Sequence, residues 1–296
     1  MVQILIQTLT SGFVSGMVFG LPVIFIGWLL HRRRRRHRAE ALEPFTEMPL
    51  RAPGESLRPK IEEKDNQFDE AFVQMALAGI LSIGIVSIAP TQLKLGVATG
   101  AIIVSAIVYM WSARRMLKLQ KQLWNYRLGF TGERVTGEAL NQLLAHGLQV
   151  FHDVPFEGFN IDHVIVGPAG VYAVETKTRR KRTELKGAAK AVVHYDGREL
   201  TFPRHRETAP IEQARLNAKT LSKWLTQSTG ESTAVSGIVT LPGWWVESTG
   251  RSDVLVMNPK QVVGMFSNAP HSTLSADQIQ RIVYQLTERC RLTKES

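Results

Sequence analysis

Residues 159–177 read FNIDHVIVGPAGVYAVETK, and this stretch sets the expected fold of the C-terminal part of the chain. Apolar residues alternate with a period of two on both sides of the turn-forming cluster 167–170, so the stretch predicts a β-hairpin. Glu175 and Lys177 lie two apart and share one face. Antiparallel pairing about the turn brings Asp162 opposite Glu175. The hairpin therefore predicts three charged side chains that converge at one end.

Two carboxylates and a lysine in this arrangement suit metal-dependent phosphodiester hydrolysis, with Mg²⁺ (or Mn²⁺) as the cofactor. We expect Asp162 and Glu175 to bind the metal, with the main-chain carbonyl of Thr176 as a third ligand. Lys177 is expected to orient or deprotonate the attacking water and to offset developing charge. An ordinary surface strand also carries Glu and Lys two apart as a charge pair. However, the apolar flanks predict strands covered on both faces, where three charges need a reason.

A helix is expected upstream of the hairpin, from Thr131 to a stop at Gly147. Its apolar stripe is predicted to contain Val135, Ala139, Leu140, Leu143 and Leu144. At 100° per residue, Glu133 falls on the flank of this stripe and Glu138 on the opposite side. A carboxylate at the edge of a core needs a partner or a metal. Glu133 is therefore a candidate site residue, whereas Glu138 is expected to be a surface charge.

Strands and helices alternate through the rest of the chain. The pattern predicts strands at 148–155, 235–241 and 253–257, a hairpin over 191–202 that turns at Asp196-Gly197, and helices at 210–227 and from the capping box 275–278 to Arg291. The sequence has no phosphate-loop motif, no zinc-spaced Cys/His cluster and no nucleophile elbow.

Four consecutive cations follow Lys177: Arg179, Arg180, Lys181 and Arg182. They suit a nucleic-acid backbone; a solvated loop or a membrane-surface patch is the alternative. Trp244 and Trp245 offer rings for base stacking or, more commonly, a cap at the edge of the core. His163 points away from Asp162 by alternation, which favours a structural role over proton transfer.

Three apolar runs precede this region, at about 9–30, 71–89 and 93–111, and each is near the length of a membrane-spanning helix. A run of arginines and histidines at 31–38 follows the first, and further basic residues follow the third. Because cytoplasmic segments carry the positive charge, we expect a multi-pass protein of the inner (plasma) membrane with its N-terminus outside. The first run lacks a preceding positive charge, so it does not fit a signal peptide.

The loop 31–70 is expected to be cytoplasmic, and its part 39–66, rich in proline and charge, is expected to have little fold. Glycines recur every four residues in the first and third runs, at Gly12, Gly16, Gly20, Gly96 and Gly100. This spacing suits close helix packing in a bundle or a homo-oligomer, or reflects the frequency of glycine in membrane helices.

The formal net charge is +10, and from Ser112 onward 25 Lys and Arg outnumber 17 Asp and Glu. A basic cytoplasmic domain suits polyanions such as nucleic acid. For the arginine run, attraction to anionic lipid headgroups is the stronger reading. The single cysteine, Cys290, cannot form an internal disulfide and fits a reducing compartment.

Five motifs occur in order: GFTGE at 129–133, FHDV at 151–154, IDHVIV at 161–166, GVYAVETK at 170–177 and PIEQ at 210–213. Together they resemble the nuclease-related domain (NERD), a branch of the PD-(D/E)XK nuclease superfamily, over about residues 125–245. The resemblance implies a restriction-endonuclease-like αβββαβ core with a central mixed sheet and metal-dependent cleavage of nucleic acid. It also implies that Glu133 and Gln213 belong to the site. The chain departs from many members before Asp162, where Asn160-Ile161 replaces a segment ending in proline.

The sequence therefore predicts an α/β protein: three transmembrane helices within 1–111, then a cytoplasmic nuclease domain over 112–296. The expected activity is metal-dependent hydrolysis of DNA at the membrane. The alternative is a catalytically silent NERD module that binds nucleic acid or a partner protein there. Two interpretations of Asn217, one helical turn after Gln213, stay open: it contacts the site, or it lies at the solvent-exposed edge of the helix.

Overall fold

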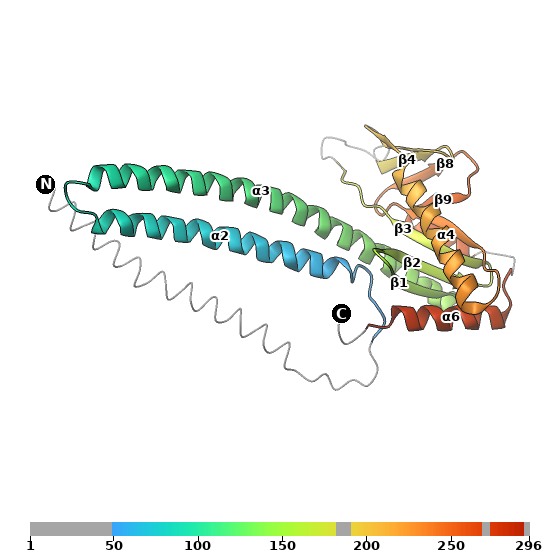
Figure 1. The fold of residues 1–296 in the computed structure, drawn as a ribbon. Helices are drawn as coiled ribbons and strands as arrows, with labels where there is room; N and C mark the ends of the chain where they lie inside the picture. The colour runs from blue at the N-terminus through green and yellow to red at the C-terminus, as the bar shows by residue number, and fades with distance from the viewer. Residues whose placement is uncertain (1–48, 182–190, 268–272, 293–296) are drawn as a thin grey trace. The chain divides into compact units, whose positions relative to one another are not determined.

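The computed structural model describes residues 49–181, 191–267 and 273–292 (Figure 1). The predicted span 9–30, the arginine run and Arg182 lie outside these residues. The chain divides into two compact units. The described part of the first is Glu62–Trp124; the second combines Glu47–Ile61 with Asn125–Ser296, within the described ranges. The division between the units falls after Trp124. The domain boundary expected after residue 111 stays a prediction.

The described part of the first unit consists of most of two long helices, α2 (Leu57–Ile88) and α3 (Lys94–Leu140). The start of α2, up to Ile61, and the end of α3, from Asn125, belong to the second unit. Both helices are long and apolar enough to cross a membrane, with mean hydropathies of 1.7 and 1.8 in their most apolar stretches. Many of their large apolar side chains are exposed, as at Leu81, Ile102 and Ile107, which suits helices that face lipid. Within the described residues there are two such helices, not three, and they contain residues 71–88 and 94–111 of the predicted spans 71–89 and 93–111.

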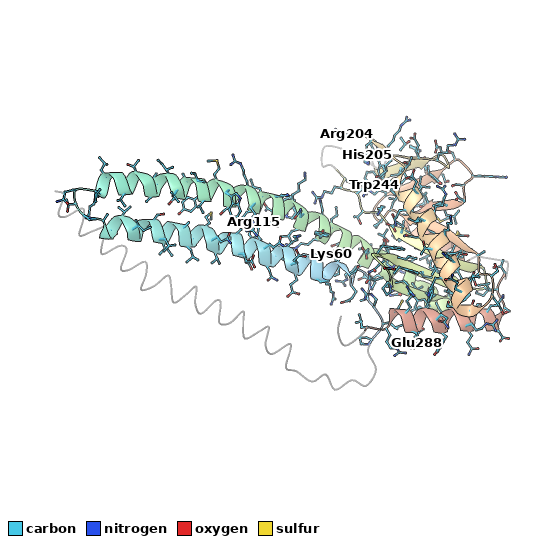
Figure 2. All side chains as sticks on the ribbon, viewed as in Figure 1. Lys60, Arg115, Arg204, His205, Trp244 and Glu288 are labelled. Carbon is cyan, nitrogen blue, oxygen red and sulfur yellow. The ribbon has the colours of Figure 1, made fainter. Side chains whose placement is uncertain are left out.

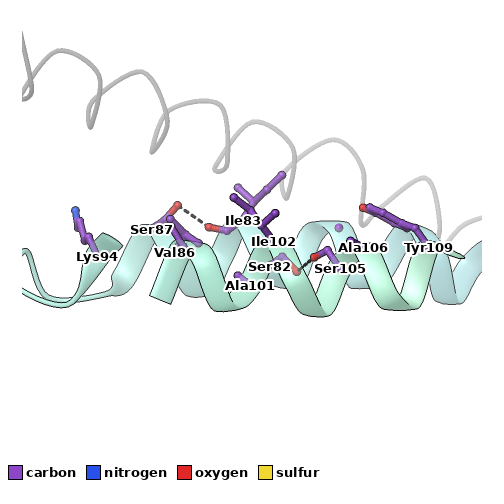
Figure 3. Close-up of a pocket in the computed structure, with 12 residues that line it drawn as sticks. Ser82, Ile83, Val86, Ser87, Lys94, Ala101, Ile102, Ser105, Ala106 and Tyr109 are labelled. Carbon is purple, nitrogen blue, oxygen red and sulfur yellow. Dashed lines mark hydrogen bonds between the residues drawn. The ribbon is translucent and has the colours of Figure 1, made fainter. Parts of the chain in front are cut away.

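An apolar groove of about 550 Å³ lies between α2 and α3 (Figure 3). The hydroxyls of Ser82 and Ser105 are hydrogen-bonded to each other across the helix pair, and Gly79 allows the Tyr109 hydroxyl to approach α2. A Cβ added at Gly96 or Gly100 would meet nothing within 4 Å. These two glycines therefore do not join α3 to α2, and their role in an oligomer stays a prediction.

The helix expected to begin at Thr131 is instead the end of α3, since nothing between 112 and 130 interrupts the helix. It continues as the 3₁₀ segment η1 (Asn141–His146) and stops at Gly147, whose φ is 79°, as predicted. The expected apolar stripe is only partly right. Leu140 and Leu143 are buried, whereas Val135 and Leu144 are exposed.

Up to Gly137, the buried face of α3 near its end consists of small and polar residues, and only then comes a large apolar one: Gly132, Glu133, Thr136, Gly137 and then Leu140. These positions follow the 3–4 residue spacing of one helix face. A search for apolar side chains cannot detect such a face. The tighter 3₁₀ turn that follows also displaces Leu144 from the α-helical stripe.

The central sheet of the second unit is mixed, in the order β1-β2-β3-β7-β9. Its strands are β1 (Gln149–Phe156), β2 (Phe159–Gly167), β3 (Gly170–Thr176), β7 (Val235–Thr240) and β9 (Val254–Met257). The first three are antiparallel and the last two join in parallel. Gly167 pairs with Gly170 and closes the predicted hairpin. The predicted strands at 148–155, 235–241 and 253–257 are confirmed.

Both faces of this sheet are covered, as the apolar flanks of the hairpin predicted. The helices α4 (Ala209–Thr229) and α6 (Ala276–Cys290) pack on one face, and Ile161 and Leu221 lie in that core. On the other face, η1 and α5 (Pro259–Ser267) enclose Ile165 and Ile238. The predicted helix at 210–227 and the capping box at Ser275 are both present. The helix α5 was not expected.

A second, small sheet has the order β6-β5-β4-β8. It contains β4 (Val192–Tyr195), β5 (Leu200–Thr201), β6 (Arg206–Glu207) and β8 (Trp245–Ser248). The β4–β5 hairpin turns at Asp196-Gly197 as predicted, because the Asp196 carboxylate accepts the N–H groups of Arg198 and Glu199 at 2.8 Å. β6 and β8 were not expected, because neither is flanked by an Asp-Gly turn like the one that marks β4 and β5.

Residues 49–56 form a strap within the second unit. The Arg51 N–H donates to the Cys290 carbonyl at 2.9 Å, and the Leu292 N–H donates to the Pro49 carbonyl at 3.1 Å. Residues from Leu57 onward already belong to α2. The prediction that 39–66 has little fold is therefore wrong for its described part, since Arg51 pairs with Asp153 of β1 and Pro53 packs against Gly137 of α3.

Candidate active site

The predicted convergence at the end of the hairpin is present. His163 pairs with Val174, which makes Asp162 and Glu175 the next positions in the register. The Asp162 carboxylate accepts the Thr176 N–H at 2.7 Å. Lys177 Nζ lies 2.6 Å from Glu175 Oε1. Both carboxylates and the lysine thus meet where β3 leaves the sheet.

Glu133 reaches the same region from α3. Gly132 permits this, because a Cβ there would overlap the Thr178 hydroxyl just beyond β3. The Glu133 side chain is buried, and its Oε2 has no hydrogen-bond partner among the described residues. A buried carboxylate oxygen without a partner is costly. Glu138, by contrast, is exposed, as predicted, and it pairs with Arg134.

Two of the carboxyl groups, those of Glu133 and Asp162, have a raised pKa. Burial, with the charges of Asp153 and Glu175, raises the pKa of Glu133 to about 7. Burial, with the charges of Glu175 and Glu133, raises the pKa of Asp162 well above its usual range, although the Thr176 N–H opposes this shift. A cation in the site would relieve both effects.

Lys177 remains protonated at neutral pH. Burial works against its charge, but the charge and hydrogen bond of Glu175, together with Asp162, outweigh burial and raise the pKa of Lys177. A lysine with a raised pKa is a poor general base. The arrangement therefore favours the predicted charge-neutralising role over deprotonation of water.

Asp162, Glu175 and Glu133 fit a magnesium ion that is bound by only a few protein ligands. Among the described residues, no three His, Cys, Asp or Glu side chains form a metal-binding group. Magnesium commonly uses only one or two carboxylates and keeps several waters. Asp162 and Glu175 supply two carboxylates that repel each other, and the unpartnered Glu133 oxygen adds negative potential. The main-chain carbonyl of Thr176 stays a predicted ligand. The side-chain hydroxyl of Thr176 lies 3.2 Å from the hydroxyl of Thr240.

Gln213 reaches the site through Asn217. Gln213 Nε2 donates to Asn217 Oδ1 at 2.9 Å, and Asn217 Nδ2 donates to Glu175 Oε2 at 2.7 Å. Asn217 is fully buried, so the solvent-edge reading of this residue is wrong. Its position one turn after Gln213, beside the apolar face of α4, was the available signal. The contact fixes the orientation of the Glu175 carboxylate.

His163 lies away from Asp162, as the alternation predicted. Its Nδ1 is 2.9 Å from His152 Nδ1, and His152 Nε2 is 3.0 Å from Asn141 Oδ1. Burial lowers the pKa of both histidines, that of His152 to about 4. The two histidines are therefore neutral, and they lie on the face of the sheet that η1 covers.

The basic run after Lys177 is partly neutralised within the protein. Arg179 makes two hydrogen bonds to the Glu207 carboxylate, at 2.9 and 2.7 Å. Arg180 lies 3.4 Å from Asn125 Oδ1, and Lys181 Nζ lies 5.6 Å from the centre of the Trp244 ring. Trp244 is buried at the edge of the core, whereas Trp245 is 53% exposed on β8.

Residues 128–242 match the protein family described as the nuclease-related domain, NERD. The chain therefore carries a nuclease-related domain in this segment, which contains the three converging carboxylates, Lys177 and Asn217. Neither the curated proteins nor the solved structures compared with the chain include a match.

Proposed function

We propose that this protein is a membrane-anchored, divalent-metal-dependent nuclease that hydrolyses DNA phosphodiester bonds on the cytoplasmic side of the inner (plasma) membrane. The observation that carries the proposal is the convergence of Asp162, Glu175 and Lys177 inside a nuclease-related domain. We interpret the order α3-β1-β2-β3-α4-β7 as the restriction-endonuclease-like αβββαβ core, with the second sheet added to it.

Each side chain has a distinct task in this proposal. Asp162, Glu175 and the Thr176 carbonyl would hold Mg²⁺ or Mn²⁺, which when bound activates water and stabilises phosphoryl charge. The Lys177 ammonium offsets negative charge that develops on the phosphate. Asn217 holds Glu175 in place. Glu133, with a pKa of about 7, can accept or release a proton near neutral pH.

The membrane anchor in this proposal is the α2–α3 helix pair. The basic residues that follow the apolar part of α3 (Arg114, Arg115, Lys118 and Lys121) mark the cytoplasmic end. The turn between α2 and α3 then lies outside the cell, and the nuclease-related domain lies inside.

A second function is favoured by a specific observation. Lys177 contacts one oxygen of Glu175 and Asn217 contacts the other, so a metal must share an oxygen that is already engaged. This closed arrangement suits a silent module that binds nucleic acid or a partner protein without cutting.

A cleavage assay separates the two functions. The full chain in detergent is incubated with linear, circular and single-stranded DNA and with RNA, in Mg²⁺ or in EDTA. We expect Mg²⁺-dependent cutting by the wild type and a loss of at least about 100-fold in Lys177→Ala, since removing such a charge costs about 3 kcal/mol of transition-state stabilisation. Glu138→Ala, at an exposed carboxylate of α3, serves as the control.

If the wild type cuts nothing, or if Lys177→Ala and Asp162→Ala cut normally, the nuclease proposal fails. Thermal stabilisation by Mg²⁺ that requires Glu175, without any cutting, would establish the silent module.

A further inference from the structure

Three rings form a layered cluster beside the second sheet: Phe202, His205 and Trp244, which we call the aromatic platform. The Phe202 N–H donates to the His205 carbonyl at 2.9 Å and closes the turn between β5 and β6. The rings of these two residues stack with centres 4.5 Å apart and an angle of 4°. Phe202 in turn meets Trp244 edge to face at 5.2 Å. Each ring therefore supports the one in front of it.

The aromatic platform is tied to the strand that leaves the candidate active site. Trp244 Nε1 donates to the Arg179 carbonyl at 3.1 Å. The Arg179 guanidinium binds the Glu207 carboxylate, which lies 4.0 Å from His205 Nε2. Arg179 is only two residues after Lys177, a span of at most about 7 Å of extended chain. The contacts form a closed ring, so the platform is held at a fixed place near the site.

Only the outermost ring is accessible. Phe202 and Trp244 are buried, whereas the His205 side chain is 51% exposed. Because Phe202 covers its inner face, the imidazole presents its other face to solvent. Arg204 and Arg206 flank it and are also exposed, and Figure 2 shows Arg204, His205 and Trp244 at the same end of the unit.

A flat, immobilised ring with arginines on both sides matches the requirements of a nucleic-acid single strand. Bases stack on such rings, and cations hold the backbone. A ring that is already fixed loses little side-chain entropy on binding. The nearby carboxylates do not oppose a polyanion, since Glu199 is paired with Arg206 and Glu207 with Arg179. Bases inside a duplex are stacked on each other and cannot use the ring.

We propose that His205, supported by Phe202 and Trp244, stacks on an unpaired base, so that the site receives a single strand of nucleic acid or a frayed end. This inference rests on the proposed function, because it assigns the substrate class of the same site. Trp244 is in this view a support rather than a stacking surface.

Binding of the full chain in detergent tests the proposal, with EDTA present to prevent cutting. The probes are a fluorescent single-stranded DNA oligonucleotide, an RNA of the same sequence and the corresponding blunt DNA duplex. We expect His205→Ala to weaken single-strand binding about 5- to 150-fold, the range for loss of one stacked base, with little change for the duplex. His205→Phe keeps a flat ring and should bind like the wild type. The DNA and RNA arms show which strand is preferred.

His194→Ala is the matched control, because His194 is an exposed histidine of the same sheet whose contact is the Glu247 carboxylate. Wild-type affinity in His205→Ala, an equal loss for the duplex, or failure of His205→Phe to restore binding would overturn the proposal.

The two proposals can fail separately. His205-dependent binding without any cutting in Mg²⁺ would refute the nuclease alone. If the protein cuts nucleic acid but His205→Ala binds the single strand as tightly as the wild type, only the stacking role is refuted.

Discussion

Glu133 shows how a single buried carboxyl links this fold to pH. Its pKa rises from an ordinary value of 4.5 to about 7 in the folded chain, chiefly through burial. The folded protein therefore holds this proton more tightly than the unfolded chain does. The sign follows directly: the contribution of Glu133 to stability is full below about pH 4.5 and is lost as the pH rises through 7.

We predict that Glu133→Gln removes this dependence. In EDTA, the wild type should lose about 3 kcal/mol relative to the variant between pH 4.5 and 7, since each unit of pKa shift corresponds to about 1.4 kcal/mol. Thermal or denaturant unfolding of both proteins across this range measures the difference. The comparison cancels the opposite effect of His152, whose pKa burial lowers to about 4 and which destabilises the fold in acid. A difference that does not vary with pH would contradict the prediction.

The contacts of a single residue could be predicted where the pattern of its strand or helix fixes which side chains it meets. Asp162, Glu175 and Lys177 lie on paired strands, where a period of two and one turn fix which side chains meet. Asn217 was left undecided because helical spacing places it beside the apolar face without saying which strand it faces. Its partner, Glu175, comes from an element 42 residues away, and no local pattern carries that information.

At the scale of elements, the strap of residues 49–56 is held mainly by one side chain of β1. Asp153 has a φ of 49°, unusual for a residue other than glycine. Its carboxylate binds the Arg51 guanidinium at 2.6 Å, the Ser56 hydroxyl at 2.6 Å and the Asn160 amide at 3.0 Å. The composition of the strap resembles a disordered linker, so its fold could not be predicted without knowing that this buried carboxylate exists.

We predict that Arg51→Ala destabilises the second unit by about 3 kcal/mol, because it leaves the buried Asp153 carboxylate without its cation. The same substitution at Arg134, whose pair with Glu138 is exposed, should cost less than about 0.5 kcal/mol. Denaturant unfolding measures both, and limited proteolysis should cut the strap faster in Arg51→Ala. Equal stability of the two variants would show that the strap is not held by this ion pair.

At the scale of the whole molecule, the proposed membrane topology places the α2–α3 turn and the nuclease-related domain on opposite sides. Cysteine labelling can decide this, because the native thiol does not interfere. Cys290 is buried, and burial raises its pKa to about 12, which leaves almost no reactive thiolate at neutral pH. The natural chain should therefore take up no maleimide unless it is unfolded.

We predict that Gln92→Cys, in the exposed turn between α2 and α3, is labelled by a membrane-impermeant maleimide in intact cells. Ser232→Cys, in an exposed loop after α4, should be labelled only after the cells are permeabilised. The proposed topology leads to this expectation, because basic residues such as those after the apolar part of α3 are typical of cytoplasmic segments. Labelling of Ser232→Cys in intact cells would place the nuclease-related domain outside, where it meets no cytoplasmic nucleic acid. The proposed cleavage of DNA on the cytoplasmic side of the membrane therefore requires this orientation.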